Sequence, residues 1–162
     1  MTGRPLVFLD VDGPLIPLRA RPGTPAGVPP ADPSGHPLIH RLDPADGARL
    51  LALGGDLVWA TTWAHTANEL VAPRLGLPQL PVVSFEDGPP AVAGLHWKTI
   101  PLMQWAGGRP FVWLDDEVTG VDRWWVHDFH EGPALVHRVD PLAGLTAADF
   151  AAVGAWLRAQ VA

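Results

Sequence analysis

The chain contains no cysteine and only one lysine, Lys98, compared with ten arginines. Without cysteine the protein can have no disulfide bridge, no thiolate metal site and no cysteine nucleophile. Long apolar runs are missing as well. The first run follows Met1–Pro5 and is far too short for a signal-peptide core or a membrane span. We therefore expect a soluble protein located in the cytoplasm.

Positive charge is also scarce. The formal net charge is −6 at pH 7. Such a chain has no basic field with which to hold a nucleic-acid backbone or an anionic membrane. We expect no membrane partner, and the net charge disfavours a nucleic-acid partner without ruling one out. A phosphate group would have to be held locally, by a few side chains.

The 162 residues, 48% of them hydrophobic, suffice for one sizeable core, and we expect a single domain over residues 1–162. Proline and glycine make up 36 residues, but the apolar segments between them are strongly patterned, so we interpret them as breaks between elements. Residues 14–40 differ from the rest because they contain eight prolines and no lasting periodicity. We expect a surface flap there.

Short apolar runs bounded by turn residues predict five buried strands, at Leu6–Leu9, Leu57–Ala60, Leu80–Ser84, Pro110–Leu114 and Ala134–Val139. Helical segments lie between them. The first helix is predicted to start with Asp43 as N-cap and Pro44 at the first helical position, and the last with Thr146 as N-cap. The predicted helix ends are at Gly54 and Gly55, at Gly76 and at Gly107. Alternating strands and helices imply right-handed crossovers and a parallel sheet covered on both faces. The sequence predicts an α/β three-layer sandwich around a five-stranded, Rossmann-like parallel sheet.

Polar side chains follow three of these strands at the point where each strand ends. They are Asp10 and Asp12 after the first strand, Thr61 and Thr62 after the second, and Asp115, Asp116 and Glu117 after the fourth. Lys98 stands on the first turn of the helix before the fourth strand. In open α/β sheets, ligands bind outside the carboxyl ends of the strands. Each of these residues alone could equally be an ordinary solvent-exposed side chain. Their order and placement together favour one shared site.

Four motifs in this order resemble those of the haloacid dehalogenase (HAD) superfamily of phosphohydrolases. They are "DVDG" with Asp10 and Asp12, "ATT" with Thr61 or alternatively Thr62, Lys98, and "LDD" with Asp115 and Asp116. The likeness spans residues 6 to 116, and the last strand and helix complete the fold. The stretches "VWATTWAHTAN" and "DPLAGLT" further resemble small bacterial HAD domains, including a branch associated with Swiss-Army-knife RNA repair proteins. By this resemblance the strand order is 5-4-1-2-3.

The resemblance implies a phosphatase that hydrolyses a phosphomonoester, from a small metabolite or a nucleotide, through an aspartyl-phosphate. Asp10 is then the nucleophile, and Asp12 serves as general acid and afterwards as general base. Thr61 and Lys98 hold the phosphoryl oxygens, where charge must be matched during transfer. The presence of Asp12 favours phosphate chemistry over the dehalogenase branch, which lacks an acid at that position.

The resemblance also implies a Mg²⁺ ion as cofactor, because an anionic nucleophile must meet an anionic substrate. Its ligands are the Asp10 carboxylate, the main-chain carbonyl of Asp12, and Asp115, with Asp116 binding directly or through water. Glu117 is either an outer partner of the metal or an acid in the first turn of a helix.

Other residues are candidates for contacts with the substrate. Gly13 lets the chain turn closely behind the acid pair. Thr62, Trp63 and Trp97 lie beside the proposed phosphate ligands, and either tryptophan could stack on a base or sugar or simply pack in the core. Pro14 stands where the family usually has threonine or valine, which leaves the geometry of the flap open.

No insertion is large enough for an independent cap domain. The site is therefore either open to a large substrate or closed by the flap or a second subunit, which leaves a homo-oligomer open. Two alternative functions also remain: a phosphatase that acts on nucleic-acid ends, and a non-catalytic module that binds a phosphorylated ligand or a protein. A two-component receiver domain is disfavoured because its phosphorylated aspartate would end the third strand, where this sequence has "VVSFEDG".

Overall fold

The computed structural model describes residues 3–23 and 32–161, and within them four strands form one sheet in the order β2-β1-β3-β4. All three strand pairs are parallel, which confirms the predicted α/β class with a parallel sheet. The strands are β1 (Leu6–Leu9), β2 (Asp56–Trp59), β3 (Phe111–Asp115) and β4 (Ala134–Arg138).

Five α-helices accompany this sheet in the described residues. They are α1 (Asp46–Ala52), α2 (Ala72–Leu75), α3 (Thr99–Ala106), α4 (Gly120–Phe129) and α5 (Ala147–Val161). A short 3₁₀ helix, η1 (Ile39–Arg41), precedes α1, and a π-helical turn, η2 (Ala67–Val71), leads into α2. The longest of them, α5, has 15 residues, and no helix in the described ranges is both long enough and apolar enough to cross a membrane.

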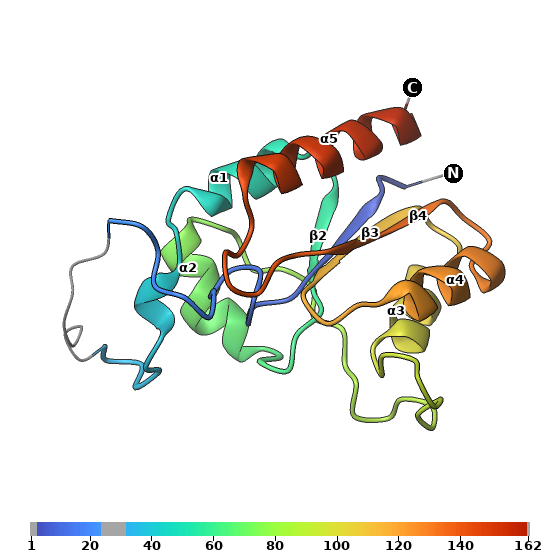
Figure 1. The fold of residues 1–162 in the computed structure, drawn as a ribbon, viewed down its shortest axis with the longest axis horizontal. Coiled ribbons are helices and arrows are strands. Elements are labelled where there is room, and N and C mark those ends of the chain that lie inside the picture. Colours follow the sequence, from blue (N-terminus) through green and yellow to red (C-terminus); the bar gives the residue numbers. More distant parts are fainter. Residues whose placement is uncertain (1–2, 24–31, 162) are drawn as a thin grey trace.

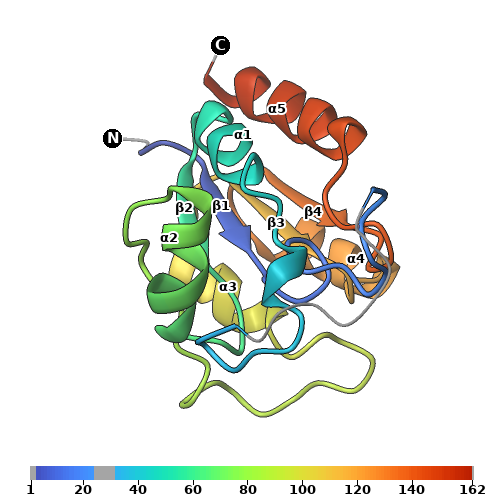
Figure 2. The ribbon, with the colours of Figure 1, turned by 90° about the vertical axis from the view of Figure 1, so that its left-hand side faces the viewer.

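The helices lie in two layers on opposite faces of the sheet, with α1 and α5 on one side and α3 and α4 on the other (Figures 1 and 2). Alternate residues of β1 serve the two layers, as the pleat of a strand requires. Val7 and Leu9 pack with residues of α1, α2 and α5, whereas Leu6 and Phe8 pack with residues of α3 and α4. The predicted three-layer arrangement is therefore present.

The predicted third strand, Leu80–Ser84, is not a strand in the structure. It contributes one isolated bridge, between Trp59 and Val82, beside the edge strand β2. Two local features explain the loss. The side-chain amide of Asn68 takes over both main-chain groups of Leu80, with its Nδ2 donating to the carbonyl and its Oδ1 accepting from the N–H, each at 2.8 Å. Pro81 then supplies no N–H to a ladder. The described sheet thus has four strands and not the five predicted.

Several helix limits also differ from the sequence prediction. Helix α1 begins at Asp46 with Ala45 as its N-cap, so the helix starts two residues later than predicted. The Asp43 carboxylate still accepts a hydrogen bond from the N–H of Ala45, at 2.9 Å, in the turn before the helix. The stops at Gly76 and Gly107 are confirmed, since both have left-handed backbone conformations, with φ of 68° and 58°.

Only the two ends of the predicted flap, residues 14–23 and 32–40, lie inside the described residues. The first end is held by the chain after β4: the N–H of Leu145 donates to the Pro14 carbonyl at 2.8 Å, and the N–H of Leu18 donates to the Pro141 carbonyl at 2.7 Å. At the other end, Ile39 of η1 is buried in the core. Both described ends of the flap therefore pack against the domain.

Candidate functional site

Three acidic side chains meet where the two central strands end. Asp10 follows β1, Asp115 is the last residue of β3, and Asp116 follows it. The N–H of Asp10 donates to the carbonyl of Leu114 at 3.2 Å, which fixes the two chain segments side by side. One carboxylate oxygen from each of the three acids lies within 4.8 Å of the others. We call these three residues the acid cluster.

Lys98 completes the arrangement from the start of α3. Its Nζ atom lies 2.8 Å from Oδ2 of Asp115 and 3.3 Å from Oδ1 of Asp10. The lysine and both of these acids are buried. An ammonium group has three N–H donors, so two contacts with the cluster leave one donor for a further acceptor. The single lysine of the chain thus contacts two acids that are distant from it in sequence.

Neutral donors fix the two buried carboxylates as well. The N–H of Val11 donates to Oδ1 of Asp10 at 2.9 Å, and the N–H of Glu117 donates to Oδ1 of Asp115 at 3.0 Å. The indole Nε1 of Trp113, in β3, donates to Oδ2 of Asp115 at 3.3 Å. Trp113 therefore does more than fill the core. These contacts hold the oxygens in set positions before any ligand arrives.

The charges in the acid cluster are not balanced, because three carboxylates face one ammonium group. Burial raises the pKa of Asp10 from 3.8 to about 7; the Lys98 ammonium opposes that rise, and the charge of Asp115 adds to it. Burial and the charge of Asp115 likewise raise the pKa of Asp116 to about 6. Such a cluster favours whatever neutralises it, which is either protons or a further cation.

Gly13 closes the turn behind the acid pair, as predicted. Its φ of 97° is in the region that only glycine adopts freely, and its N–H donates to the carbonyl of Ile16 at 3.0 Å. A Cβ atom at this position would lie 2.6 Å from Cγ of Asp116. The missing side chain is therefore what allows the Asp116 carboxyl group to lie against the loop.

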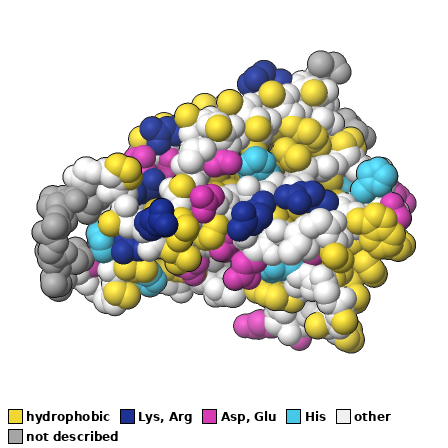
Figure 3. Space-filling view, in the orientation of Figure 1, with side chains coloured by type: hydrophobic (Ala, Val, Ile, Leu, Met, Phe, Trp, Pro, Cys, Tyr) yellow, Lys and Arg dark blue, Asp and Glu magenta, His cyan; other side chains and the backbone are white. Residues whose placement is uncertain are grey.

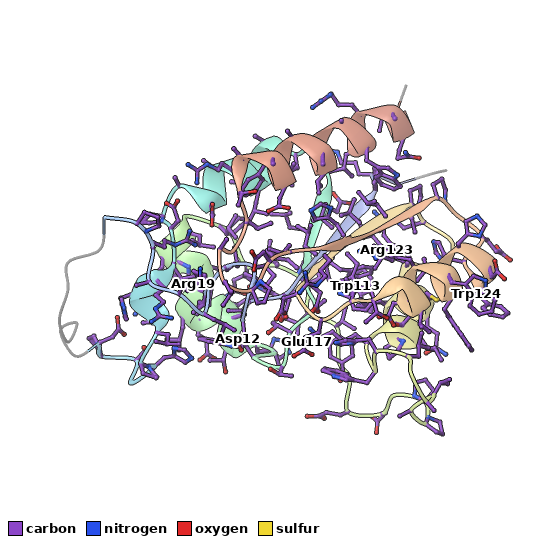
Figure 4. The ribbon with its side chains drawn as sticks, in the orientation of Figure 1. Asp12, Arg19, Trp113, Glu117, Arg123 and Trp124 are labelled. Carbon is purple, nitrogen blue, oxygen red and sulfur yellow. The ribbon has the colours of Figure 1, made fainter. Side chains whose placement is uncertain are left out.

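Asp12 occupies a different environment from Asp10. Its side chain is exposed, and its Oδ2 accepts a hydrogen bond from Nε1 of Trp63 at 3.0 Å. Figure 4 shows Asp12 and Glu117 near each other, below the sheet in the lower middle of the view. The ring of Trp63 also lies 4.7 Å from the ring of His36, which belongs to the flap. Asp12 is thus held beside the acid cluster by a residue that also contacts the flap.

The predicted hydroxyl and aromatic residues lie to one side of this centre. Thr61 is buried, and its Oγ1 accepts a hydrogen bond from the N–H of Trp63 at 3.2 Å, whereas Thr62 is exposed. Trp97 is 44% exposed, and the centre of its ring lies 5.4 Å from Nζ of Lys98. In the described residues no hydrogen bond joins the Thr61 or Thr62 side chain to the acid cluster, so their roles stay predictions.

Sequence reasoning missed Asp122, which is completely buried at the start of α4. Its Oδ1 accepts from the N–H of His96 at 2.8 Å and from Oγ1 of Thr99 at 3.0 Å, while its Oδ2 accepts from the N–H of Thr119 at 2.8 Å. The carboxylate therefore ties the segment that carries Lys98 to the loop that follows the acid cluster. The pattern Thr119-x-x-Asp122 is a capping-box signature that could have revealed both the helix and this residue.

The surface around the site carries both signs of charge. Figure 3 shows Lys and Arg side chains close to Asp and Glu side chains, and hydrophobic side chains gathered over α4. The exposed members of that hydrophobic group include Trp124 and Phe129.

No protein-family model matches this chain, and searches of the curated proteins and of the solved structures likewise find no match. A function must therefore be supported by the arrangement of the chain's own side chains.

Proposed function

We propose that the chain is a Mg²⁺-dependent phosphatase of the HAD type, which hydrolyses a phosphomonoester through an aspartyl-phosphate on Asp10. The observation that carries the proposal is the contact of one buried lysine with two of three clustered acids at the carboxyl edge of the sheet. These residues come from three separate segments of the chain. A fold does not require such a cluster, and perturbed acids in this setting are typical of functional sites.

The chemistry of the acid cluster supports a hard divalent cation. Mg²⁺ prefers oxygen ligands and is usually bound by one or two carboxylates together with water and substrate phosphate. Asp10 and Asp115 would hold it, with Asp116 and the main-chain carbonyl of Asp12. When bound, the ion supplies positive charge that lets an anionic carboxylate approach an anionic phosphoryl group.

The division of roles between Asp10 and Asp12 follows from their environments. Asp10 is buried, and hydrogen bonds and Lys98 fix its carboxylate, which suits a nucleophile that must attack phosphorus in line. Asp12 is exposed, so it can donate a proton to the leaving oxygen. It can then take a proton from the water that hydrolyses the aspartyl-phosphate, which returns both acids to their starting states. The indole of Trp63 orients Asp12 for both transfers.

Lys98 and Thr61 would hold the non-bridging oxygens of the phosphoryl group. The third N–H of the Lys98 ammonium is free to donate once the other two face Asp10 and Asp115. The Thr61 hydroxyl accepts from a main-chain N–H, which leaves its own hydrogen available to a phosphoryl oxygen. Both groups therefore act as preorganised donors.

The test is hydrolysis of p-nitrophenyl phosphate with and without Mg²⁺, followed by a panel of phosphorylated metabolites, nucleotides and phosphorylated oligonucleotide ends. We expect Asp10→Asn to lower kcat by at least ~10³-fold, as for loss of other catalytic nucleophiles. Asp56→Asn, at the opposite end of the sheet, is the matched control and should keep the activity. A phosphoryl adduct on Asp10 after acid quenching would support the intermediate. Metal-independent hydrolysis, or full activity in Asp10→Asn, would overturn the proposal.

A further inference from the structure

A pocket of about 450 Å³ opens between the loop after β2 and the segment that contains the isolated bridge, and the residue before Lys98, Trp97, lines it. The residues that matter for its chemistry are Thr61, Thr62, His65, Phe85, Glu86 and Trp97. We propose that this pocket holds the leaving group of the substrate, and that this group is a flat, uncharged aromatic ring, as in an aryl or nucleoside phosphate. The inference rests on the proposed function and narrows its substrate class.

The position of the pocket connects it to the phosphate ligands. Thr61, a proposed donor to the phosphoryl oxygens, also lines the pocket. Trp97 directly precedes Lys98, whose Nζ atom lies 5.4 Å from the centre of the indole. A phosphoryl group bound between Lys98 and Thr61 would therefore have the pocket next to it. The leaving group is the part of a phosphomonoester that this space would receive.

The aromatic wall of the pocket is fixed before a ligand binds. The ring of Trp97 meets the edge of Phe85 at 4.9 Å between centroids and stacks on His96 at 5.4 Å. Asp122 in turn holds His96 by its main-chain N–H. A restrained indole that is still 44% exposed loses little conformational freedom when a second ring covers it. Flat rings gain more from such a wall than aliphatic groups of equal size.

The other lining residues narrow the chemistry further. Val82 and Val83 give the pocket an apolar side, which suits a ring and not a sugar alone. Thr62, His65 and Glu86 add polar groups that can meet hydrogen-bonding atoms at a ring edge. The carboxylate of Glu86 would repel a negative charge on the leaving alcohol, in addition to that of the phosphoryl group. The best match is a monophosphate of a neutral aromatic alcohol or nucleoside.

The experiment compares two phosphonates, one with a flat aromatic ring and one with a saturated ring of the same number of carbon atoms. Their P–C bond resists hydrolysis, so binding is measured without turnover. Benzylphosphonate and cyclohexylmethylphosphonate are titrated into the full chain with Mg²⁺ by calorimetry. We expect benzylphosphonate to bind about tenfold more tightly, and we expect this ratio to fall to about one in Trp97→Ala and to an intermediate value in Trp97→Phe. Trp124→Ala, which removes an exposed indole on α4, should keep the tenfold ratio.

The possible outcomes separate this inference from the proposed function. Equal binding of the two phosphonates by the unaltered chain, or a ratio unchanged in Trp97→Ala, would refute the aromatic pocket and leave the phosphatase proposal intact. If neither phosphonate binds, the phosphate site is absent and both proposals fail. A third arm, an adenosine 5′-phosphonate, identifies the source of the ring: tighter binding than benzylphosphonate indicates a nucleoside, and weaker binding an aryl alcohol.

Discussion

Two ion pairs lie at opposite ends of the same sheet and differ strongly in burial. At the carboxyl end, Lys98 contacts Asp115 at 2.8 Å, with side chains 4% and 1% exposed. At the amino end, Arg109 contacts Asp56 at the same distance, with side chains 35% and 47% exposed. Equal geometry therefore occurs in two very different dielectric surroundings.

The difference in burial indicates why each pair is present. An exposed pair adds about 0 to 1 kcal/mol of stability and needs no further explanation. A buried pair must offset the loss of hydration of both ions, and apolar residues of similar size often stabilise a protein equally well. The cluster at the carboxyl end also contains two more acids, which add repulsion. Stability alone does not explain this set of charges, and this is a reason for proposing a site for a cation and a phosphate.

The largest expected effect comes from removing the cation of each pair in turn. Lys98→Met leaves two buried carboxylates without their cationic partner and should lower the free energy of unfolding by about 3 to 5 kcal/mol at pH 8. Arg109→Met, the matched change at the amino end, should cost no more than about 1 kcal/mol. Urea unfolding measures both, and millimolar Mg²⁺ should restore part of the loss in Lys98→Met only. Equal losses in the two variants would contradict the comparison.

A rise in pH from 4 to 7 should weaken the acid cluster at the carboxyl end of the sheet. The pKa of Asp10 is 3.8 in the unfolded chain and about 7 in the folded protein, so the folded state holds its proton more tightly. The contribution of Asp10 to stability is therefore full below pH 4 and falls as the pH rises to 7, by at most about 1.4 kcal/mol per pH unit. The raised pKa of Asp116 likewise makes stability fall as the pH rises to about 6.

This pH dependence can be measured in metal-free buffer by urea unfolding at a series of pH values. Asp10→Asn should flatten the decline, because an amide does not titrate in this range. Asp56→Asn, in the exposed pair, should leave the slope unchanged. A slope that is identical in Asp10→Asn and the unaltered chain would show that Asp10 does not carry the effect.

A smaller effect is expected from Asp122, which positions the lysine side of the cluster. Asp122→Asn replaces one carboxylate oxygen with an NH₂ group, which would face hydrogen-bond donors of His96, Thr99 or Thr119. The change should lower the free energy of unfolding by about 1 to 3 kcal/mol. Because Lys98 follows His96 closely, we also expect kcat/KM to fall with the phosphatase substrates. A variant that loses stability but keeps kcat/KM would limit Asp122 to a structural role.

The smallest effect is expected from Trp63→Phe, which keeps an aromatic ring and removes the N–H that donates to Asp12. The contact is exposed, so the free energy of unfolding should change by less than about 1 kcal/mol. The change should instead appear in the pH profile of kcat, because Asp12 would lose the donor that orients it. An unchanged profile would exclude this role for Trp63.

The sequence sufficed for the central strands and for the three acids and the lysine that lie together at their ends, because each of these signals is local. The strands β1, β2, β3 and β4 are apolar runs, and the acids that follow β1 and β3 must meet if those strands are parallel neighbours. The left-handed glycines Gly76 and Gly107 likewise ended their helices where expected.

The features that the sequence did not predict depend on contacts between residues that are separated in the chain. The segment at Leu80 has strand-like residues, but the Asn68 side chain occupies its main-chain groups, and no local pattern announces that contact. The capping-box pattern at Thr119 could have pointed to Asp122, but its contacts with His96 and Thr99 are visible only in the folded chain. The lining of the aromatic pocket likewise combines three separate segments, so no single stretch could have revealed it.

The segment beyond β2 is hydrogen-bonded to Trp59 through Pro81 and Val83, and this local attachment has a consequence for how such a protein can diversify. Val82 makes the only bridge between this segment and β2 in the described residues, so Ser84, Phe85 and Glu86 can be exchanged without breaking a ladder. The acids and the lysine, in contrast, are anchored to β1, β3 and α3. Substitutions in this one peripheral segment could therefore retune which alcohol is accepted while the reaction centre stays intact.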